Sequence, residues 1–351
     1  MCSARALHPA PAPAPAPRED PMTTIAIIGA GYMGHTHAAA FAALGHADDI
    51  AYVCSPTATA LADAPNAEYV PDLNIVLADP AVDVVSICTP TPTHRDIAVR
   101  ALGAGKHVLL EKPIALSTTD ALAISAAARL SGRVLMVAHV VRFFEGYRRA
   151  RADVDAGRIG TVLSARARRL ITKPGQGWWH DDTKSGGPVV DVGIHDFDQL
   201  NLFLGTPIAV TARARDPLGP IETTIDYESG ALGQVLTFAD LPEGAPFTTG
   251  LELLGSDGLL DYDFAADAPT ASTPDSGVNS YRLATPAGST ADTLSRLDHY
   301  TRQAEYFLEC VRNGTDPVFC PTASAVLALD VALAARQSLL SGETVLLEAR
   351  A

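Results

Sequence analysis

Asp191 and His195 lie four residues apart, directly after a Gly-Gly-Pro break at residues 186–188. The apolar residues around them recur at helical spacing, which predicts a single helix over 189–204 with a buried stripe. An offset of four residues brings both side chains to the same face of that helix. A carboxylate beside an imidazole serves as an acid/base pair, as two metal ligands or as part of a solvated helix face. This spacing alone leaves all three open.

A lysine follows an apolar run in the segment "HVLLEKP". Glu111 and Lys112 come directly after this expected strand, and Thr89 and Pro90 come directly after the strand before it. The carboxyl ends of parallel strands meet at one edge of a sheet, where ligands bind. Lys112 can therefore donate a hydrogen bond to a substrate oxygen near a cofactor, although its position alone favours an ordinary surface lysine.

Three glycines lie between an apolar run and a helical stretch in "IAIIGAGYMGHTHAAAF". The first permits a tight turn, the second lets the backbone approach a pyrophosphate, and the third lets the helix pack on the strand. Free N–H groups at the start of the helix then bind the phosphates. This arrangement predicts a dinucleotide site whose loop residues are Gly29, Ala30, Gly31, Tyr32, Met33 and Gly34.

The end of the second expected strand distinguishes NAD from NADP, because an acidic residue there holds the ribose hydroxyls. Ser55 occupies that place, and the next acidic residue is Asp63. No arginine or lysine lies nearby to bind a 2′-phosphate. Ser55 is expected to contact the cofactor, and the choice between NAD(H) and NADP(H) stays open.

Short apolar runs alternate with helical stretches over residues 23–141. Strands that are apolar on both faces are typical of a parallel sheet covered by helices on both sides. This part of the chain is therefore predicted to be an N-terminal Rossmann domain, a doubly wound parallel α/β sheet. Strands are expected at 23–29, 50–54, 82–88, 107–111 and 134–138, and helices at 32–44, 72–78, 93–104 and 117–131.

The pattern changes over residues 142–351, which are predicted to form an α+β domain for substrate binding and oligomerisation, with an open, mainly antiparallel sheet. An open sheet face is commonly covered by a second subunit, so pairing with another subunit is expected. The Pro/Ala-rich residues 1–22 are expected to form a disordered tail. Period-two alternation and turn residues predict a strand at 161–172, hairpins at 223–238 and 251–264, helices at 144–156, 296–312 and 322–340, and a last strand at 344–348.

Composition argues against several classes of partner. The chain has 351 residues, a formal net charge of −14 and 47% hydrophobic residues. Nucleic acids and anionic membranes need clustered Lys and Arg, so neither is an expected partner. No apolar run reaches the ~18 residues of a membrane span. Five cysteines without a CxxC spacing indicate reduced thiols and a cytoplasmic protein.

Four motifs together resemble the glucose–fructose oxidoreductase/inositol dehydrogenase/MocA (Gfo/Idh/MocA) family: "GAGYMGHTH", "TPTPTH", "GKHVLLEKP" and "GGPVVDVGIHDFD". The resemblance covers the chain from Thr24 onward. It implies that Lys112 bonds the reacting oxygen and that Asp191 and His195 complete the catalytic site, His195 as the acid/base. It also implies cofactor contacts from Thr89, Pro90, His94 and Glu111, and a homodimer or homotetramer. Ser55 departs from the pattern, which affects cofactor preference and leaves catalysis untouched.

Several other residues have two interpretations each. Arg142 is expected either to bind substrate or to form an interdomain salt bridge. Trp178 and Trp179 are candidates for stacking on the apolar face of a sugar, or for anchoring their loop. His37 is expected to pack near the interdomain cleft rather than to catalyse. A metal is not expected, because the spacing of the Asp and His residues around His195 matches no known cluster.

The resemblance implies an NAD(P)-dependent oxidoreductase that acts on a hydroxyl or carbonyl carbon of a sugar, cyclitol or related polyol. A neutral imidazole with a pKa near ~6.5 would take the hydroxyl proton at neutral pH, and a lysine would stabilise the alkoxide. Asp191 would orient the imidazole or bond a neighbouring hydroxyl. The alternatives are a cofactor-retaining glycoside hydrolase and a non-catalytic dinucleotide sensor, and the presence of Lys112, Asp191 and His195 together argues against the sensor.

Overall fold

The computed structural model describes residues 23–57, 60–175, 177–216, 219–266, 277–294 and 298–348. The expected tail at 1–22 lies outside this range. The first part of the chain forms a six-stranded parallel sheet in the order β3-β2-β1-β4-β5-β6, which confirms the doubly wound topology. The strands are β1 Ile25–Ile28, β2 Ile50–Cys54, β3 Glu68–Val70, β4 Val84–Ile87, β5 His107–Leu110 and β6 Leu135–Val137.

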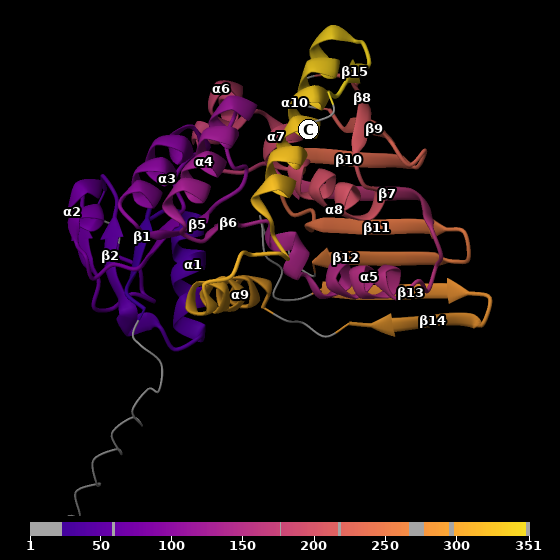
Figure 1. The fold of residues 1–351 in the computed structure, drawn as a ribbon. Helices are drawn as coiled ribbons and strands as arrows, with labels where there is room; N and C mark the ends of the chain where they lie inside the picture. The colour runs from indigo at the N-terminus through magenta and orange to yellow at the C-terminus, as the bar shows by residue number, and fades with distance from the viewer. Residues whose placement is uncertain are drawn as a thin grey trace, which may run out of the picture.

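Helices cover both faces of this sheet (Figure 1). The four predicted helices are present as α1 Tyr32–Ala43, α2 Leu73–Ala78, α3 His94–Gly103 and α4 Thr118–Ser131. Only β3 was not predicted, because it has three residues and begins with an exposed glutamate. A helix from late in the chain, α9 His299–Asn313, lies beside α1, and its Phe307 packs with Ile27 and Phe41 in one hydrophobic core.

The second sheet has nine strands in the order β14-β13-β12-β11-β7-β10-β9-β8-β15. Only the pair β10 and β7 is parallel, so the prediction of a mainly antiparallel sheet is confirmed. Both predicted hairpins are present, as β9–β10 and β11–β12. The bounds are β7 Val162–Thr172, β8 Pro207–Ala214, β9 Ile221–Tyr227, β10 Leu232–Leu241, β11 Thr248–Gly255, β12 Leu259–Ala266, β13 Gly277–Thr285, β14 Gly288–Thr293 and β15 Val345–Leu346.

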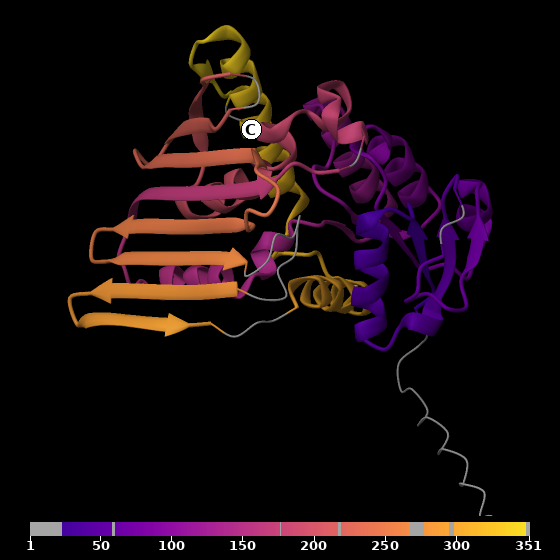
Figure 2. The ribbon, with the colours of Figure 1, turned by 180° about the vertical axis from the view of Figure 1, so that it is seen from behind.

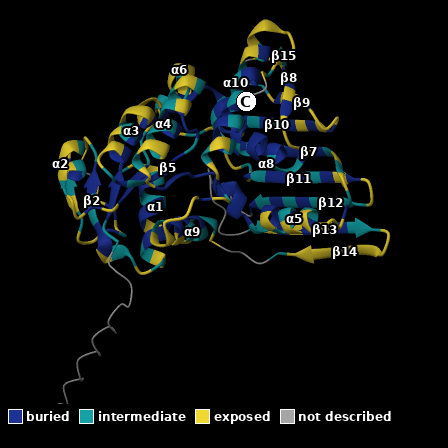
Figure 3. Ribbon diagram, in the orientation of Figure 1, coloured by how far each residue is buried: buried dark blue, intermediate teal, exposed yellow. Residues whose placement is uncertain are grey.

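One face of the second sheet packs on helices α5 Glu145–Asp155, α8 Ile194–Leu204 and α10 Thr322–Ser341. Figure 2 shows the opposite face, on which no described helix lies. In β9 every second residue is exposed, as expected for a strand with only one covered face (Figure 3). The open face predicted from the sequence is therefore present in this single chain.

The helix α10 has the length and mean hydropathy of a membrane-spanning segment, 20 residues and 1.4. Its apolar side chains pack against α8 and β8, and half of its apolar window is buried inside the protein. Core packing therefore accounts for its composition.

The single helix expected over 189–204 is wrong, because the chain forms two helices there. The short helix α7 Pro188–Asp191 and α8 are separated at Val192 and Gly193. A Cβ atom on Gly193 would come within 2.6 Å of the carbonyl oxygen of Val189, so this close approach of the backbone requires glycine. The remaining short helices are η1 Ala47–Asp49, η2 Thr91–Thr93, η3 Val140–Phe143, η4 Gly177–His180 and α6 Asp182–Ser185.

Candidate active site

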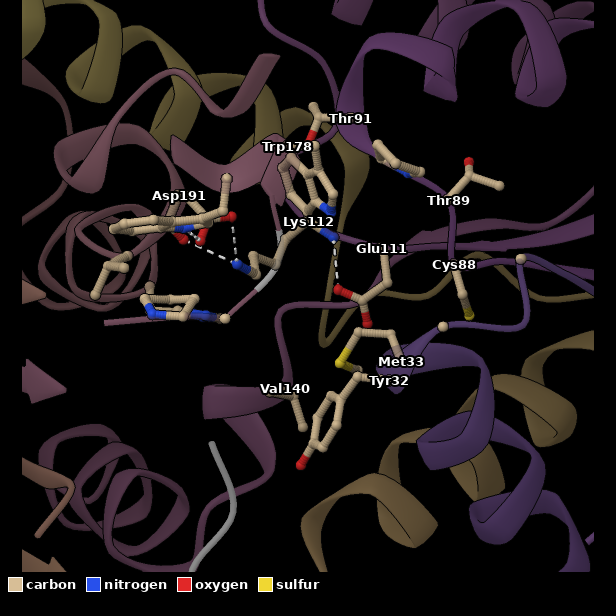
Figure 4. A pocket seen from close by; sticks show the side chains of 18 of the residues that line it. Tyr32, Met33, Cys88, Thr89, Thr91, Glu111, Lys112, Val140, Trp178 and Asp191 are labelled. Carbon is tan, nitrogen blue, oxygen red and sulfur yellow. Dashed lines mark hydrogen bonds and ion pairs between the residues drawn. The ribbon is translucent and has the colours of Figure 1, made fainter. Parts of the chain in front are cut away.

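A cavity of about 440 Å³ lies where the carboxyl ends of the parallel strands meet the second sheet (Figure 4). Its volume is that of a typical small-molecule site. It brings together most of the residues singled out in the sequence, from segments up to about half the chain apart. These residues are Gly29, Ala30, Gly31, Tyr32, Met33, Ser55, Thr89, Pro90, Glu111, Lys112, Trp178, Trp179, Asp191 and His195.

The glycine loop has the geometry that a pyrophosphate needs. Gly29 has a positive φ of 101°, which permits the turn. A Cβ on Gly34 would overlap the carbonyl oxygen of Gly29, so this third glycine serves helix packing and does not line the cavity. A Cβ on Gly31 would meet nothing within 4 Å and would point into open space on a cavity-lining residue. Helix α1 has neither a side-chain cap nor an acidic residue in its first turn, so the loop fits a dinucleotide phosphate.

Lys112 and Asp191 form an ion pair across the cavity. The Lys112 ammonium donates to Oδ1 of Asp191 at 3.0 Å and to its backbone carbonyl oxygen at 2.8 Å. Oδ2 of Asp191 accepts from the indole Nε1 of Trp179 at 2.8 Å. Both carboxylate oxygens are therefore engaged by Lys112 and Trp179. The expectation that Asp191 orients the His195 imidazole is wrong, because its carboxylate holds the lysine instead.

His195 lies in the first turn of α8 and lines the same cavity. Its Nδ1 is buried and has no hydrogen-bond partner among the described residues. Burial lowers the pKa of His195 well below 6.5, and the nearby charges of Lys112 and Arg169 lower it further. The imidazole is therefore neutral at neutral pH. The sequence-based expectation of a pKa near neutrality is corrected downward.

Glu111 is fixed by a buried network behind the cavity wall. Its Oε1 lies 2.9 Å from Nε2 of His37, whose Nδ1 lies 2.7 Å from the hydroxyl of Ser86. Burial opposes a charge on this imidazole, but Cys88 and Glu111 outweigh it and raise the pKa of His37 to about 10. The other Glu111 oxygen accepts from the backbone N–H of Lys112 at 3.1 Å. His37 thus packs behind the site and holds the segment that carries Lys112.

Two predicted contact residues lie behind the cavity wall. The ring nitrogens of His94 are each 2.9 Å from a backbone carbonyl oxygen, of Pro113 and of Thr89, so His94 ties together two cavity-lining loops. Arg142 is 3% exposed and makes two bonds to Asp198, at 2.7 Å and 2.6 Å. The substrate-binding interpretation of Arg142 is therefore corrected. Of its two interpretations, the geometry supports the salt bridge.

Sequence reasoning missed several side chains that line the cavity, among them Arg169, Phe247 and Tyr300. Arg169 lies on β7, is 3% exposed, and donates from Nε and Nη2 to the buried Asp196 at 3.0 Å and 2.9 Å. The sequence did contain a signal for Arg169, because this arginine falls at a position of β7 where the alternating pattern places buried residues. Within the described residues, no group of three metal-ligating side chains comes together.

Comparison with known proteins covers most of the chain. Residues 23–139 match the Gfo/Idh/MocA oxidoreductase family with an NAD-binding Rossmann fold, and residues 147–261 match a Gfo/Idh/MocA C-terminal domain. The chain is 29% identical over 293 residues to scyllo-inositol 2-dehydrogenase (NAD(+)) of Bacillus subtilis, covering 78% of this chain and 80% of the relative.

A second relative is D-xylose 1-dehydrogenase (NADP(+)) 2 of Haloferax volcanii, 31% identical over 253 residues, or 69% of this chain and 74% of the relative. The crystal structure of GenD2 from gentamicin A biosynthesis in complex with NAD superposes with a TM-score of 0.78 at 26% identity, covering 95% of this chain and 99% of that one. Motifs, fold and relatives agree, and the chain belongs to the Gfo/Idh/MocA oxidoreductase family.

Proposed function

We propose that this protein transfers a hydride between a nicotinamide cofactor and a hydroxyl or carbonyl carbon of a sugar, cyclitol or related polyol. The observation that carries the proposal is the placement of Lys112, Asp191 and His195 in one cavity with the glycine loop. The names of the relatives, which include an inositol and a xylose dehydrogenase, support the substrate class.

The site chemistry follows from the available donors and acceptors. A nicotinamide cofactor held by the glycine loop would supply the hydride acceptor for the carbinol carbon. An ammonium has three N–H donors, and two of those on Lys112 go to Asp191, so one remains for the substrate oxygen. That cation stabilises the oxygen as it loses its proton. The neutral imidazole of His195 accepts the proton.

The cofactor loop and the apolar walls have separate roles in this proposal. Gly31 and the start of α1 would hold the phosphates, and Ser55, which lines the same cavity, would contact the adenosine ribose. Either NAD(H) or NADP(H) is compatible with this lining. The indole of Trp178 borders the cavity and offers a face for the apolar C–H side of a sugar ring.

A substrate screen tests this function. The protein is incubated with myo-inositol, scyllo-inositol, D-xylose or methyl D-glucoside and with NAD⁺ or NADP⁺, and reduced nicotinamide is followed by absorbance. We expect at least one of these polyols to reduce NAD⁺ or NADP⁺, and we expect His195→Asn to lose this activity. Cleavage of an aryl glycoside without net formation of reduced nicotinamide would support the hydrolase alternative. If the protein bound the cofactor but showed neither activity, the result would support the non-catalytic dinucleotide sensor.

We also propose the division into a dinucleotide-binding part, residues 23–141, and a substrate-binding part, residues 142–351, in a cytoplasmic enzyme. The open face of the nine-stranded sheet supports a homodimer or homotetramer, because such a face is commonly covered by a second subunit. Light scattering at micromolar concentration should give a multiple of the 36.7 kDa chain mass. A mass of one chain would contradict the assembly.

A further inference from the structure

A buried histidine that the chemistry above does not use lies between β6 and η3. His139 is 2% exposed, and neither of its ring nitrogens has a hydrogen-bond partner among the described residues. A buried polar group without a partner costs roughly 1–3 kcal/mol. Such groups are commonly satisfied by a buried water. An unpartnered histidine therefore lowers the stability of the fold relative to an apolar residue at the same place.

His139 lies beside the helix that carries His195. Its Nδ1 is 3.7 Å from Oδ2 of Asp198, which is within ion-pair range and longer than a hydrogen bond. Asp198 follows His195 by three residues on α8, so the two side chains lie on one side of that helix. The Nδ1 of His195 is also buried without a partner among the described residues. Within the described residues, two buried imidazole rings with unpartnered nitrogens are therefore found at the start of α8, His195 on the helix and His139 beside it.

The charged groups that shift the pKa of His195 are cationic, whereas carboxylates as well as cations shift the pKa of His139. Lys112 and Arg169 lie near His195, and both disfavour a proton on it. Burial lowers the pKa of His139 as well, but Asp198 opposes that shift, and Glu111 does so more weakly, against Arg142 and Lys112. Asp198 stays ionised because Arg142 holds its pKa down despite its burial. A proton that moves from His195 to His139 thus leaves Arg169 and approaches the carboxylate of Asp198, while Lys112 acts on both rings and Arg142 partly offsets the gain.

We propose that His139 is a second proton carrier of the active site, which receives the substrate proton from His195 through a bridging water. This inference rests on the proposed oxidoreductase function. During oxidation the O–H bond of the substrate breaks and its proton passes to the ring nitrogen of His195 that faces the cavity. The proton on Nδ1 of His195 then passes to the water, and a proton of that water passes to His139. Release of a proton from His139 to solvent leaves both rings neutral, and exchange of the His195 proton from its cavity-facing nitrogen back to Nδ1 through water restores the starting tautomer.

The test compares His139→Gln with His107→Gln. His107 is a partly buried histidine at the amino end of β5, away from the cavity-lining edge of the sheet. Oxidation of the substrate found in the screen is measured in H₂O and D₂O and with added imidazole. We expect His139→Gln to lower kcat by roughly 10–100-fold, less than the loss of a residue that contacts substrate, with little change in KM. The solvent isotope effect should rise, and imidazole should restore the rate in proportion to its concentration.

The outcomes separate the carrier from the function on which it rests. His107→Gln should behave like the wild-type protein in every measurement. If the wild-type protein turns over, His195→Asn loses activity and His139→Gln keeps the wild-type kcat, the proton carrier is wrong and the oxidoreductase stands. A loss in His139→Gln that neither imidazole nor D₂O affects would mean that His139 is structural. An inactive wild-type protein overturns both proposals.

Discussion

The ammonium of Lys112 lies 3.0 Å from Oδ1 of Asp191 and 2.8 Å from the backbone carbonyl oxygen of the same residue. One residue of the second half of the chain thus holds the lysine that follows the fifth strand of the first sheet. The contact fixes the lysine across the cavity and leaves one of its donors for a ligand.

Replacing Lys112 by Met keeps most of the side-chain length and removes the cation. We expect turnover to fall roughly 10²–10³-fold, as when one donor to a developing oxyanion is lost. Initial rates with the substrate found in the screen measure this. Lys184→Met, at an exposed lysine that pairs with Asp181, is the matched control and should retain full activity. Equal activity in both variants would remove Lys112 from the mechanism.

The pH profile depends on His195, which acts as a base only when neutral. Its pKa lies well below 6.5, so the neutral form dominates above that pH and is lost as the pH falls through the lowered pKa. The kcat/KM for oxidation should therefore stay flat through pH 6.5 and fall only in more acidic solution. In Lys112→Met one of the depressing cations is gone, so the acid limb should move to higher pH. A wild-type limb at or above pH 6.5 would contradict this assignment.

Gly31→Asp should abolish dinucleotide binding in a folded protein. The new side chain enters the open space at the start of α1, and its carboxylate repels the pyrophosphate. We expect affinity to weaken by about 100-fold or more, about 2.7 kcal/mol, in calorimetric titrations with NADH and NADPH. Gly103→Asp, at an exposed helical glycine with nothing within 4 Å of its Cβ position, is the control. Unchanged affinity in Gly31→Asp would place the cofactor elsewhere.

Gly34→Ala should lower stability, in contrast with Gly31→Asp, which should lower affinity. The added methyl group would overlap the carbonyl oxygen of Gly29, so helix and loop must move apart. Overpacking of this kind typically costs 1–3 kcal/mol, roughly, in the free energy of unfolding. Thermal and urea unfolding without ligand should show the loss. A variant as stable as the wild type would mean that α1 is free to shift on the sheet.

Arg142→Met should destabilise the protein by about 3–5 kcal/mol, because it leaves the buried carboxylate of Asp198 without its guanidinium partner. Urea unfolding measures the loss, and Arg142→Met/Asp198→Leu should recover much of it because no buried charge remains. The control Arg148→Met breaks only a partly exposed pair with Glu145 and should change stability by about 0.5 kcal/mol or less. If Arg142→Met raised KM and left stability unchanged, Arg142 would be a substrate-binding residue.

The sequence by itself determined the parts that depend on local pattern. Continuous apolar runs gave the parallel strands, period-two alternation gave β7 and both hairpins, and the glycine spacing gave the phosphate loop. The motifs around Lys112 and His195 also pointed to residues that share one cavity. Local patterns carry this information because each element must bury one face, whatever its partners are.

Tertiary structure alone decided which polar groups meet. The carboxylate of Asp191 faces Lys112 and Trp179 rather than His195, because the backbone turns at Val192 and Gly193 between α7 and α8. Arg142 and Arg169 are both arginines near the junction of the two sheets. Asp198 binds Arg142 behind the cavity, whereas Asp196 binds Arg169 on the cavity wall. The two aspartates are two positions apart on α8. Pairing between distant side chains depends on three-dimensional distance, which one-dimensional spacing does not encode.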